Sequence, residues 1–231
     1  RRVLFRSIAH QPHREMYEAI AADFLKIDID VFIGGGSKHF NQRSDGKDLI
    51  DTLKAKGYQV LFDIDAIAQI DSNKLAGFVA EDQPLKISEG RGDYLSKAAM
   101  TAINILNNNE KGFFLMIEGS QIDWGGHAND VQYIIDEMLD FDKVIGLVLD
   151  FARQDGQTLV VITADHETGG LAINGGDFLS GTVNGTFTTT NHTGVMVPVF
   201  AYGPGAENFT GIYHNNTIFD KFVKAFEFND R

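Results

Sequence analysis

The sequence predicts an α/β domain in which a mostly parallel sheet is layered with helices. Short runs of consecutive apolar residues recur along the chain, as expected of strands that are buried on both faces. Segments with a helical pattern alternate with these runs, which is typical of layered α/β folds. The 231 residues are enough to bury the core of one sizeable domain or of two small ones.

The candidate strands are short and mostly uninterrupted by polar residues. Because a strand covered on both faces has no polar side to present to water, such runs favour central, parallel strands. The last run contains a proline, Pro198, which cannot donate a ladder hydrogen bond. The runs are Ile29–Ile33, Tyr58–Phe62, Phe113–Ile117, Leu159–Thr163 and Val195–Tyr202.

The clearest helical pattern extends over Val131–Ala152. Its apolar residues fall mostly at three- and four-residue steps, and either Asn129 or Asp130 can cap its first turn. We expect its apolar stripe to pack on the sheet. Weaker helical patterns cover Arg14–Lys26, Gly46–Lys56, Asp93–Asn107 and Thr217–Phe226.

The segment 169–191 differs from the rest of the chain. It has several glycines and a threonine-rich patch, Thr186–Thr190, but no helical period. Such a segment is typical of an excursion from the sheet, and a hairpin over a functional site is one interpretation.

The composition excludes several classes of protein and site. A net charge of −12 with no basic block argues against general binding to nucleic acids or anionic membranes. Without cysteine, the chain has no thiolate zinc site and no cysteine nucleophile, so a metal would be held by histidine and carboxylate. No apolar run reaches the ~20 residues of a membrane span, and residues 1–7 lack the apolar core of a signal peptide.

Acidic residues and histidines gather directly after two of the predicted strands. Residues 118–127 follow the run that ends at Ile117, and residues 164–170 follow the run that ends at Thr163. His192 comes shortly before the last apolar run. Since ligands of open α/β sheets bind beyond the carboxyl ends of the strands, we expect these groups to face one crevice.

Taken singly, each of these residues has an ordinary structural explanation, such as a helix cap, a turn residue or a hydrogen-bonded histidine. Taken together, carboxylates and histidines beside glycines are costly to bury unpaired but favourable around divalent cations. Zinc accepts imidazole nitrogen and carboxylate oxygen, whereas magnesium prefers oxygen ligands. The inventory therefore suits a mixed zinc and magnesium cluster.

The order of these blocks resembles the metal-binding blocks of alkaline phosphatases. The similar segments are 118–127, 163–166 and 192–194, the last followed by Ala-Tyr-Gly-Pro at 201–204. The resemblance extends over most of residues 8–226. It implies an incomplete, alkaline-phosphatase-like three-layer α/β/α sandwich in a single domain, 8–231, with residues 1–7 unmatched.

The resemblance also implies a role for each candidate site residue. Arg14 matches the family's arginine that binds two phosphate oxygens. An arginine suits this role because its guanidinium is planar and can bind two oxygens at once. The implied set has two zinc ions and one magnesium ion: Asp123, His127 and His192 at the first zinc, Asp165 and His166 at the second, Glu118 at magnesium, and Arg14 on the phosphate.

The Asp-Ser nucleophile motif of the family has no match in its expected place. Asp71-Ser72 follows the arginine block instead of preceding it, so we interpret this pair as a loop or cap. The sequence therefore looks like the C-terminal half of an alkaline phosphatase. In the intact enzyme the resemblance implies hydrolysis of phosphomonoesters through a phosphoserine, and we expect the isolated chain to be inactive or nearly so.

Two other functions remain open at this stage. One is a related hydrolase of the same superfamily, such as a phosphodiesterase or a sulfatase, and the other is a non-catalytic module stabilised by metal. The family resemblance further implies homodimers and a periplasmic or secreted location.

Overall fold

The computed structural model describes residues 8–71 and 74–228. The unmatched segment 1–7, and Ser72 of the Asp71-Ser72 pair, lie outside the described residues. The chain groups into two compact units, which we call the first unit (Arg1–Gln121 and Leu139–Val144) and the second unit (Ile122–Met138 and Ile145–Arg231). The assignment of 8–231 to a single domain stays a prediction.

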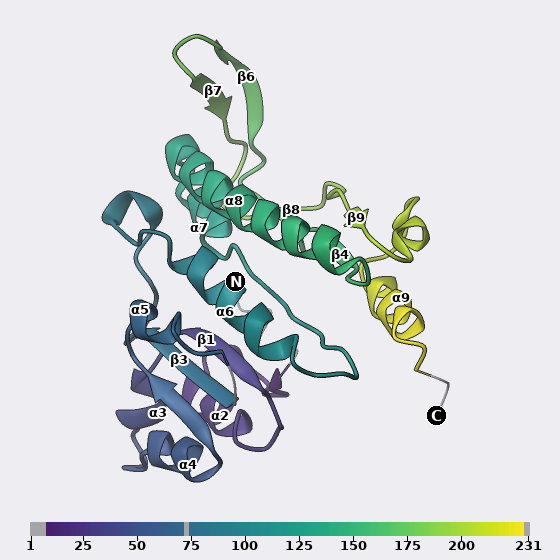
Figure 1. Cartoon of the computed structure of the whole chain (residues 1–231). Helices are drawn as coiled ribbons and strands as arrows, with labels where there is room; N and C mark the ends of the chain where they lie inside the picture. The colour runs from purple at the N-terminus through teal and green to yellow at the C-terminus, as the bar shows by residue number, and fades with distance from the viewer. Residues whose placement is uncertain (1–7, 72–73, 229–231) are drawn as a thin grey trace. The chain divides into compact units, whose positions relative to one another are not determined.

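A three-stranded parallel sheet forms the centre of the first unit (Figure 1). Strand β3 lies in the middle, with Leu75 opposite Val31 on one side and Lys74 opposite Tyr58 on the other. The strands in spatial order are β1 (Val31–Gly35), β3 (Lys74–Ala80) and β2 (Tyr58–Leu61).

Helices pack on both faces of this sheet, because neighbouring residues of β3 point to opposite sides. Ala76 and Phe78 belong to a core cluster with residues of α2, α3 and α4, whereas Leu75 packs with Ile67 of α5 and Ile105 of α6. The first unit is therefore a three-layer α/β/α arrangement. Its helices are α2 (Tyr17–Asp23), α3 (Lys38–Asn41), α4 (Leu49–Ala55), α5 (Ile64–Ile67), η1 (Ile87–Glu89) and α6 (Tyr94–Leu106).

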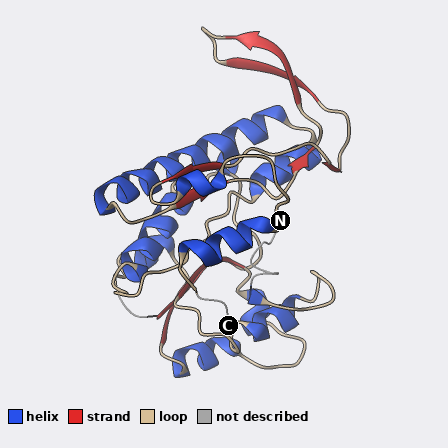
Figure 2. Cartoon of the chain, turned by 90° about the vertical axis from the view of Figure 1, so that its right-hand side faces the viewer, coloured by secondary structure: helices blue, strands red, loops and turns tan. Residues whose placement is uncertain are grey.

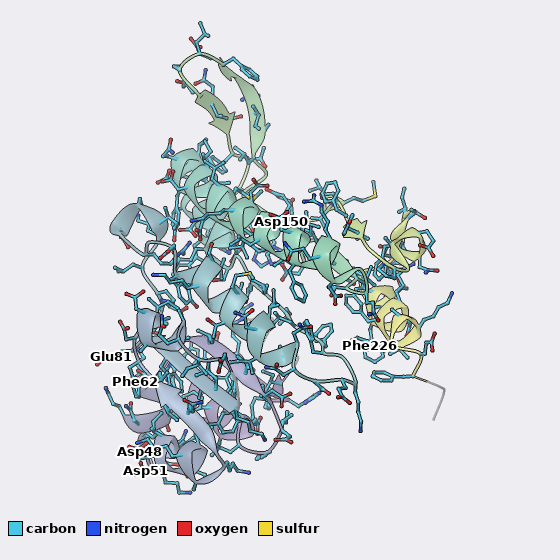
Figure 3. All side chains as sticks on the ribbon, in the orientation of Figure 1. Asp48, Asp51, Phe62, Glu81, Asp150 and Phe226 are labelled. Atoms are coloured by element: carbon cyan, nitrogen blue, oxygen red, sulfur yellow. The ribbon has the colours of Figure 1, made fainter. Side chains whose placement is uncertain are left out.

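Aspartates begin two of these helices. The side chain of Asp48, labelled in Figure 3, accepts a hydrogen bond from the Ile50 amide at the start of α4, and Asp63 accepts one from Ala66 in α5. Each carboxylate satisfies an amide that has no partner within the first turn. The helix expected over Gly46–Lys56 is therefore shorter than its pattern and begins after its cap.

The second unit contains most of the long helix α8 (Val131–Asp155), whose residues Leu139–Val144 group with the first unit. Asp130 caps it by accepting from the Tyr133 amide, and Gly156 ends it in the left-handed conformation with φ = 70°. The helix predicted from the apolar pattern is thus confirmed and extends beyond Ala152. The other helices are α7 (Gln121–Ala128), η2 (Ala206–Phe209) and α9 (Thr217–Ala225).

The strands of the second unit form antiparallel pairs. The hairpin of β6 and β7 projects away from α7 and α8 in both Figure 1 and Figure 2. The pairs are β4 (Val160–Ile162) with β9 (Phe200–Tyr202), β5 (Glu167–Thr168) with β8 (His192–Thr193), and β6 (Ala172–Asp177) with β7 (Thr182–Thr186).

Three strand predictions were wrong in part or in full. The run Leu159–Thr163 forms β4, which pairs antiparallel with β9 and not parallel as expected. Phe113–Ile117 forms no strand, because no described segment pairs with it. Within Val195–Tyr202 only Phe200–Tyr202 pairs, and it does so antiparallel to β4, because Pro198 has no amide hydrogen to donate. Conversely, the central strand β3 was not among the candidates.

No helix in the described parts of the chain combines the length and apolar character needed to cross a membrane.

Candidate metal centre

Helix α7 carries the first pair of candidate ligands. Asp123 and His127 are four residues apart, so their side chains share one face of the helix. The Nε2 atom of His127 lies 3.3 Å from Oδ1 of Asp123. The expectation that these residues follow a strand was wrong, because Phe113–Ile117 forms no strand. They lie instead on α7, a helix that was not predicted from the sequence because of its glycines at 125 and 126.

Strand β8 brings His192 to the same place. His192 pairs with Thr168 across the short β5–β8 ladder, and its Nε2 lies 3.5 Å from Oδ1 of Asp123. One ligand atom from each of Asp123, His127 and His192 lies within 4.8 Å of the others. Two imidazole nitrogens and a carboxylate oxygen form a donor set that suits zinc.

The hydrogen bonding of His127 tests whether a cation fits there. Its Nδ1 lies 2.6 Å from the carbonyl oxygen of Thr190, which can only accept, so Nδ1 carries the proton. In the neutral imidazole, Nε2 then presents a lone pair. This Nε2 is buried and has no hydrogen-bond partner among the described residues, although it faces the Asp123 carboxylate. A lone pair facing a carboxylate oxygen is unfavourable unless a proton or a metal cation lies between them, and this donor set fits a bound metal ion.

Asp165 and His166 lie beside this group, in the turn between β4 and β5. The His166 ring stacks on that of His192 with centroids 3.5 Å apart and planes 18° apart. The Nε2 of His166 lies 3.4 Å from Oδ2 of Asp165, whose side chain is 56% exposed. The second unit thus gathers the five zinc-ligand candidates, but only Asp123, His127 and His192 form the compact set of three.

Thr168 is part of this cluster, although its sequence pattern gave no reason to select it. Its hydroxyl donates to Oδ1 of Asp123 over 2.6 Å and lies 3.2 Å from Nδ1 of His166. The available signal was its position directly after Asp165-His166-Glu167.

Glu167 holds the chain around the cluster instead of pointing to a metal. Its carboxylate accepts hydrogen bonds from the Gly170 amide and from the Thr193 hydroxyl, which ties β5 to β8. The intervening Gly169 has φ = +96°, and a Cβ there would come within 2.8 Å of the Phe187 ring. A larger residue at position 169 would therefore disturb the turn that follows the ligands.

The remaining two candidates belong to the first unit. Arg14 is exposed in the turn that precedes α2, and Glu118 is partly buried in the loop that precedes α7. Their assignment to phosphate and to magnesium stays a prediction.

Comparison with known proteins places these features in a family. The family model "Alkaline phosphatase" matches residues 5–185. Alkaline phosphatase 3 of Bacillus subtilis is 30% identical over 96% of this chain, and the chain spans 64% of the length of that relative.

Solved structures agree with this match. The alkaline phosphatase of the Antarctic bacterium TAB5 is 41% identical with a TM-score of 0.90, and the alignment covers 96% of this chain and 68% of that one. A cold-active alkaline phosphatase from Shewanella is 33% identical with a TM-score of 0.85, over 95% of this chain and 71% of that one. Two histidine variants of the TAB5 enzyme have Mg bound in the M3 site. The predicted incomplete α/β fold is confirmed by these neighbours, and the chain belongs to the alkaline phosphatase family.

Proposed function

We propose that the intact protein is a metal-dependent phosphomonoesterase that works through a phosphoserine. The observation that carries this proposal is the buried, lone-pair-bearing Nε2 of His127, which faces Asp123 beside His192 in a chain of the alkaline phosphatase family.

In this proposal the second unit holds two zinc ions. Asp123, His127 and His192 would bind the first, and Asp165 and His166 would bind the second. When bound, the ions supply positive charge beside the attacking and leaving oxygens of the phosphoryl group. The Thr190 carbonyl keeps the His127 ring in the tautomer that presents Nε2 to the centre.

The family resemblance assigns roles to two further residues, Arg14 and Glu118. Arg14 would bind two phosphate oxygens through its guanidinium fork and so orient the substrate for in-line displacement. Glu118 would provide an oxygen ligand to a magnesium ion.

The resemblance assigns no nucleophilic serine to residues 1–231. We therefore expect the 231-residue chain by itself to bind zinc weakly and to hydrolyse p-nitrophenyl phosphate negligibly. Phosphate monoesters are among the most inert biological substrates, and enzymes accelerate their hydrolysis up to ~10²¹-fold. We expect no such acceleration from a site that lacks its nucleophile.

The test compares the 231-residue chain with the full-length product of its gene. We measure zinc content by atomic absorption and hydrolysis rates on p-nitrophenyl phosphate and bis(p-nitrophenyl) phosphate. The full-length product should contain zinc and favour the monoester. His127→Ala should lose both zinc and activity, whereas His214→Ala, which changes an exposed histidine outside the cluster, should keep both.

Each alternative function has its own outcome in this experiment. A preference for the diester would indicate a phosphodiesterase, and bound zinc without hydrolysis would indicate a metal-stabilised module. Full activity of the 231-residue chain would contradict the assignment of the nucleophile to residues outside it.

Two further expectations rest on the family alone. We propose that the protein forms homodimers and that it is periplasmic or secreted. Sedimentation equilibrium of the full-length product and fractionation of the source cells test these expectations.

A further inference from the structure

The hydroxyl of Thr168 lies between ligands of the two proposed zinc positions. Its Oγ1 is 2.6 Å from Oδ1 of Asp123, which belongs to the first position. The same atom is 3.2 Å from Nδ1 of His166, which belongs to the second. One side chain therefore contacts both positions without being a ligand candidate itself.

The direction of these hydrogen bonds follows from the number of protons available. A hydroxyl has one proton, and a carboxylate can only accept, so Thr168 donates its proton to Asp123. Towards His166 the hydroxyl oxygen can then only accept, which places the proton of the neutral imidazole on Nδ1. The Glu167 carbonyl, 3.3 Å from the same Nδ1, favours the same tautomer.

This tautomer leaves the lone pair of His166 on Nε2, the nitrogen that lies 3.4 Å from Asp165. His127 has the same arrangement, since its Nδ1 is held by the Thr190 carbonyl. Both rings therefore present Nε2 as the ligand atom. For His127 a main-chain carbonyl selects the tautomer, whereas for His166 the Thr168 side chain helps to select it.

The backbone holds Thr168 in place. It pairs with His192 across the β5–β8 ladder, and the neighbouring Glu167 binds the Thr193 hydroxyl and the Gly170 amide. The hydroxyl is therefore preorganised towards the ligands.

We propose that Thr168 is a positioning residue that couples the two zinc positions, an inference that rests on the proposed function. It orients the Asp123 carboxylate for the first and selects the Nε2-ligating tautomer of His166 for the second. Hydrogen bonds that orient ligands in this way contribute about 10–100-fold to metal affinity.

The test measures the zinc affinity of the 231-residue chain by competition with a chromophoric chelator. Thr168→Val keeps the shape of the side chain and removes the hydroxyl, so we expect affinity to fall about 10–100-fold. Thr168→Ser restores the hydroxyl and should restore most of the affinity. Thr182→Val makes the same chemical change in the exposed hairpin, where the hydroxyl contacts only Ser180 among the described contacts, and should leave affinity unchanged.

A second readout requires no metal. Side-chain ¹⁵N shifts of the metal-free chain at about pH 8, above the ordinary histidine pKa of about 6.5, report which ring nitrogen of His166 carries the proton. The Nδ1–H tautomer should dominate in the native chain and in Thr168→Ser, and its population should fall in Thr168→Val.

The outcomes separate this inference from the proposed function. Native zinc affinity in a folded Thr168→Val variant, or a Thr168→Ser variant as weak as Thr168→Val, would overturn the positioning role and leave the metal centre in place. No zinc uptake by the full-length product would overturn both.

Discussion

Gly126 of α7 lies directly against the backbone of Thr168 in β5. A Cβ atom at position 126 would come within 2.6 Å of the Thr168 carbonyl oxygen and 2.9 Å of its Cβ. Such distances are too short for non-bonded atoms, so only glycine allows the helix to approach the strand this closely. This close approach lets Asp123, on the same helix, accept a hydrogen bond from the Thr168 hydroxyl.

Gly126→Ala should therefore weaken both the fold of the second unit and its metal binding. Relieving the overlap requires α7 to move away from β5, at a cost of about 1–3 kcal/mol in the free energy of unfolding. Urea unfolding and chelator competition for zinc measure the two effects, and we expect both stability and affinity to fall.

The matched control is Gly146→Ala in α8. A Cβ at this position meets no atom within 4 Å, and alanine is favoured over glycine in a helix by up to ~1 kcal/mol. This variant should be as stable as the native chain or more stable, with unchanged zinc affinity. Equal effects of the two substitutions would show that contact with Thr168 does not explain the glycine at 126.

The contrast between α7 and α8 shows what the sequence could predict. Helix α8 has a long apolar pattern and an aspartate cap, and both its type and its start were predictable. Helix α7 is short and contains two adjacent glycines, which lower helix propensity, so its residues were interpreted only as a cluster after a strand. The sequence singled out the candidate ligands, whose metal binding stays a prediction, but it did not predict the helix that carries two of them.

Other features depend on contacts between distant parts of the chain. Strand β3 combines alanine and glycine with larger apolar residues, and its central place depends on β1 and β2 pairing on either side. The hydrogen bond from His127 to the Thr190 carbonyl spans 63 positions, and that from Thr168 to Asp123 spans 45. No local periodicity encodes such contacts, so the orientation of the ligands could not be predicted from the sequence.

Zinc should stabilise the 231-residue chain against thermal unfolding. A ligand that binds only the folded state at 100 times its Kd adds about 2.7 kcal/mol to the free energy of unfolding. Differential scanning calorimetry should show a rise in Tm with zinc and its reversal by EDTA. Asp123→Asn removes the charge from the centre of the cluster and should abolish this rise.

Asp220→Asn is the control for that experiment. Asp220 is an exposed carboxylate in the first turn of α9, outside the cluster. Its substitution should lower Tm slightly at most and preserve the rise with zinc. A rise with zinc in Asp123→Asn as large as in the native chain would contradict the assignment of Asp123 as a ligand.

The ion pair of Asp45 with Arg43 should contribute to the loss of folding stability at acid pH. The Arg43 guanidinium donates to both carboxylate oxygens, over 3.0 and 2.8 Å, and the Lys47 amide donates to one of them. These hydrogen bonds lower the pKa of Asp45 from 3.8 to about 2. Because the folded-state pKa is the lower one, the stabilisation is fully present above about pH 4 and is lost as pH falls towards 2.

The free energy of unfolding of Asp45→Asn should therefore be lower than that of the native chain by a constant margin above about pH 4. This margin should narrow between pH 4 and pH 2. The margin should be small, because the carboxylate is exposed to solvent. Urea unfolding at several pH values measures it, and an NMR titration of the Asp45 carboxyl carbon gives the pKa directly. A midpoint near 3.8, or a margin that widens in acid, would contradict the role of the pair.

A buried ion pair in the first unit should be far more important for stability than an exposed one. Arg91 Nη2 lies 2.9 Å from Oδ2 of Asp140, and their side chains are only 8% and 7% exposed. Asp140→Asn would remove one negative charge from beside the buried guanidinium, and we expect it to lower the free energy of unfolding by more than the loss of an exposed pair does. The double variant Arg91→Met/Asp140→Leu removes both charges and should recover much of this loss.

The exposed pair of Asp150 and Arg153 on α8 provides the comparison. Its atoms approach to 2.6 Å, closer than the buried pair, but its side chains are 64% and 57% exposed; Asp150 is labelled in Figure 3. Asp150→Asn makes the same chemical change and should cost less than about 1 kcal/mol, because water screens the pair and solvates the remaining arginine. Urea unfolding of the four proteins separates the two causes. Equal losses in Asp140→Asn and Asp150→Asn would mean that burial does not determine the contribution of each pair.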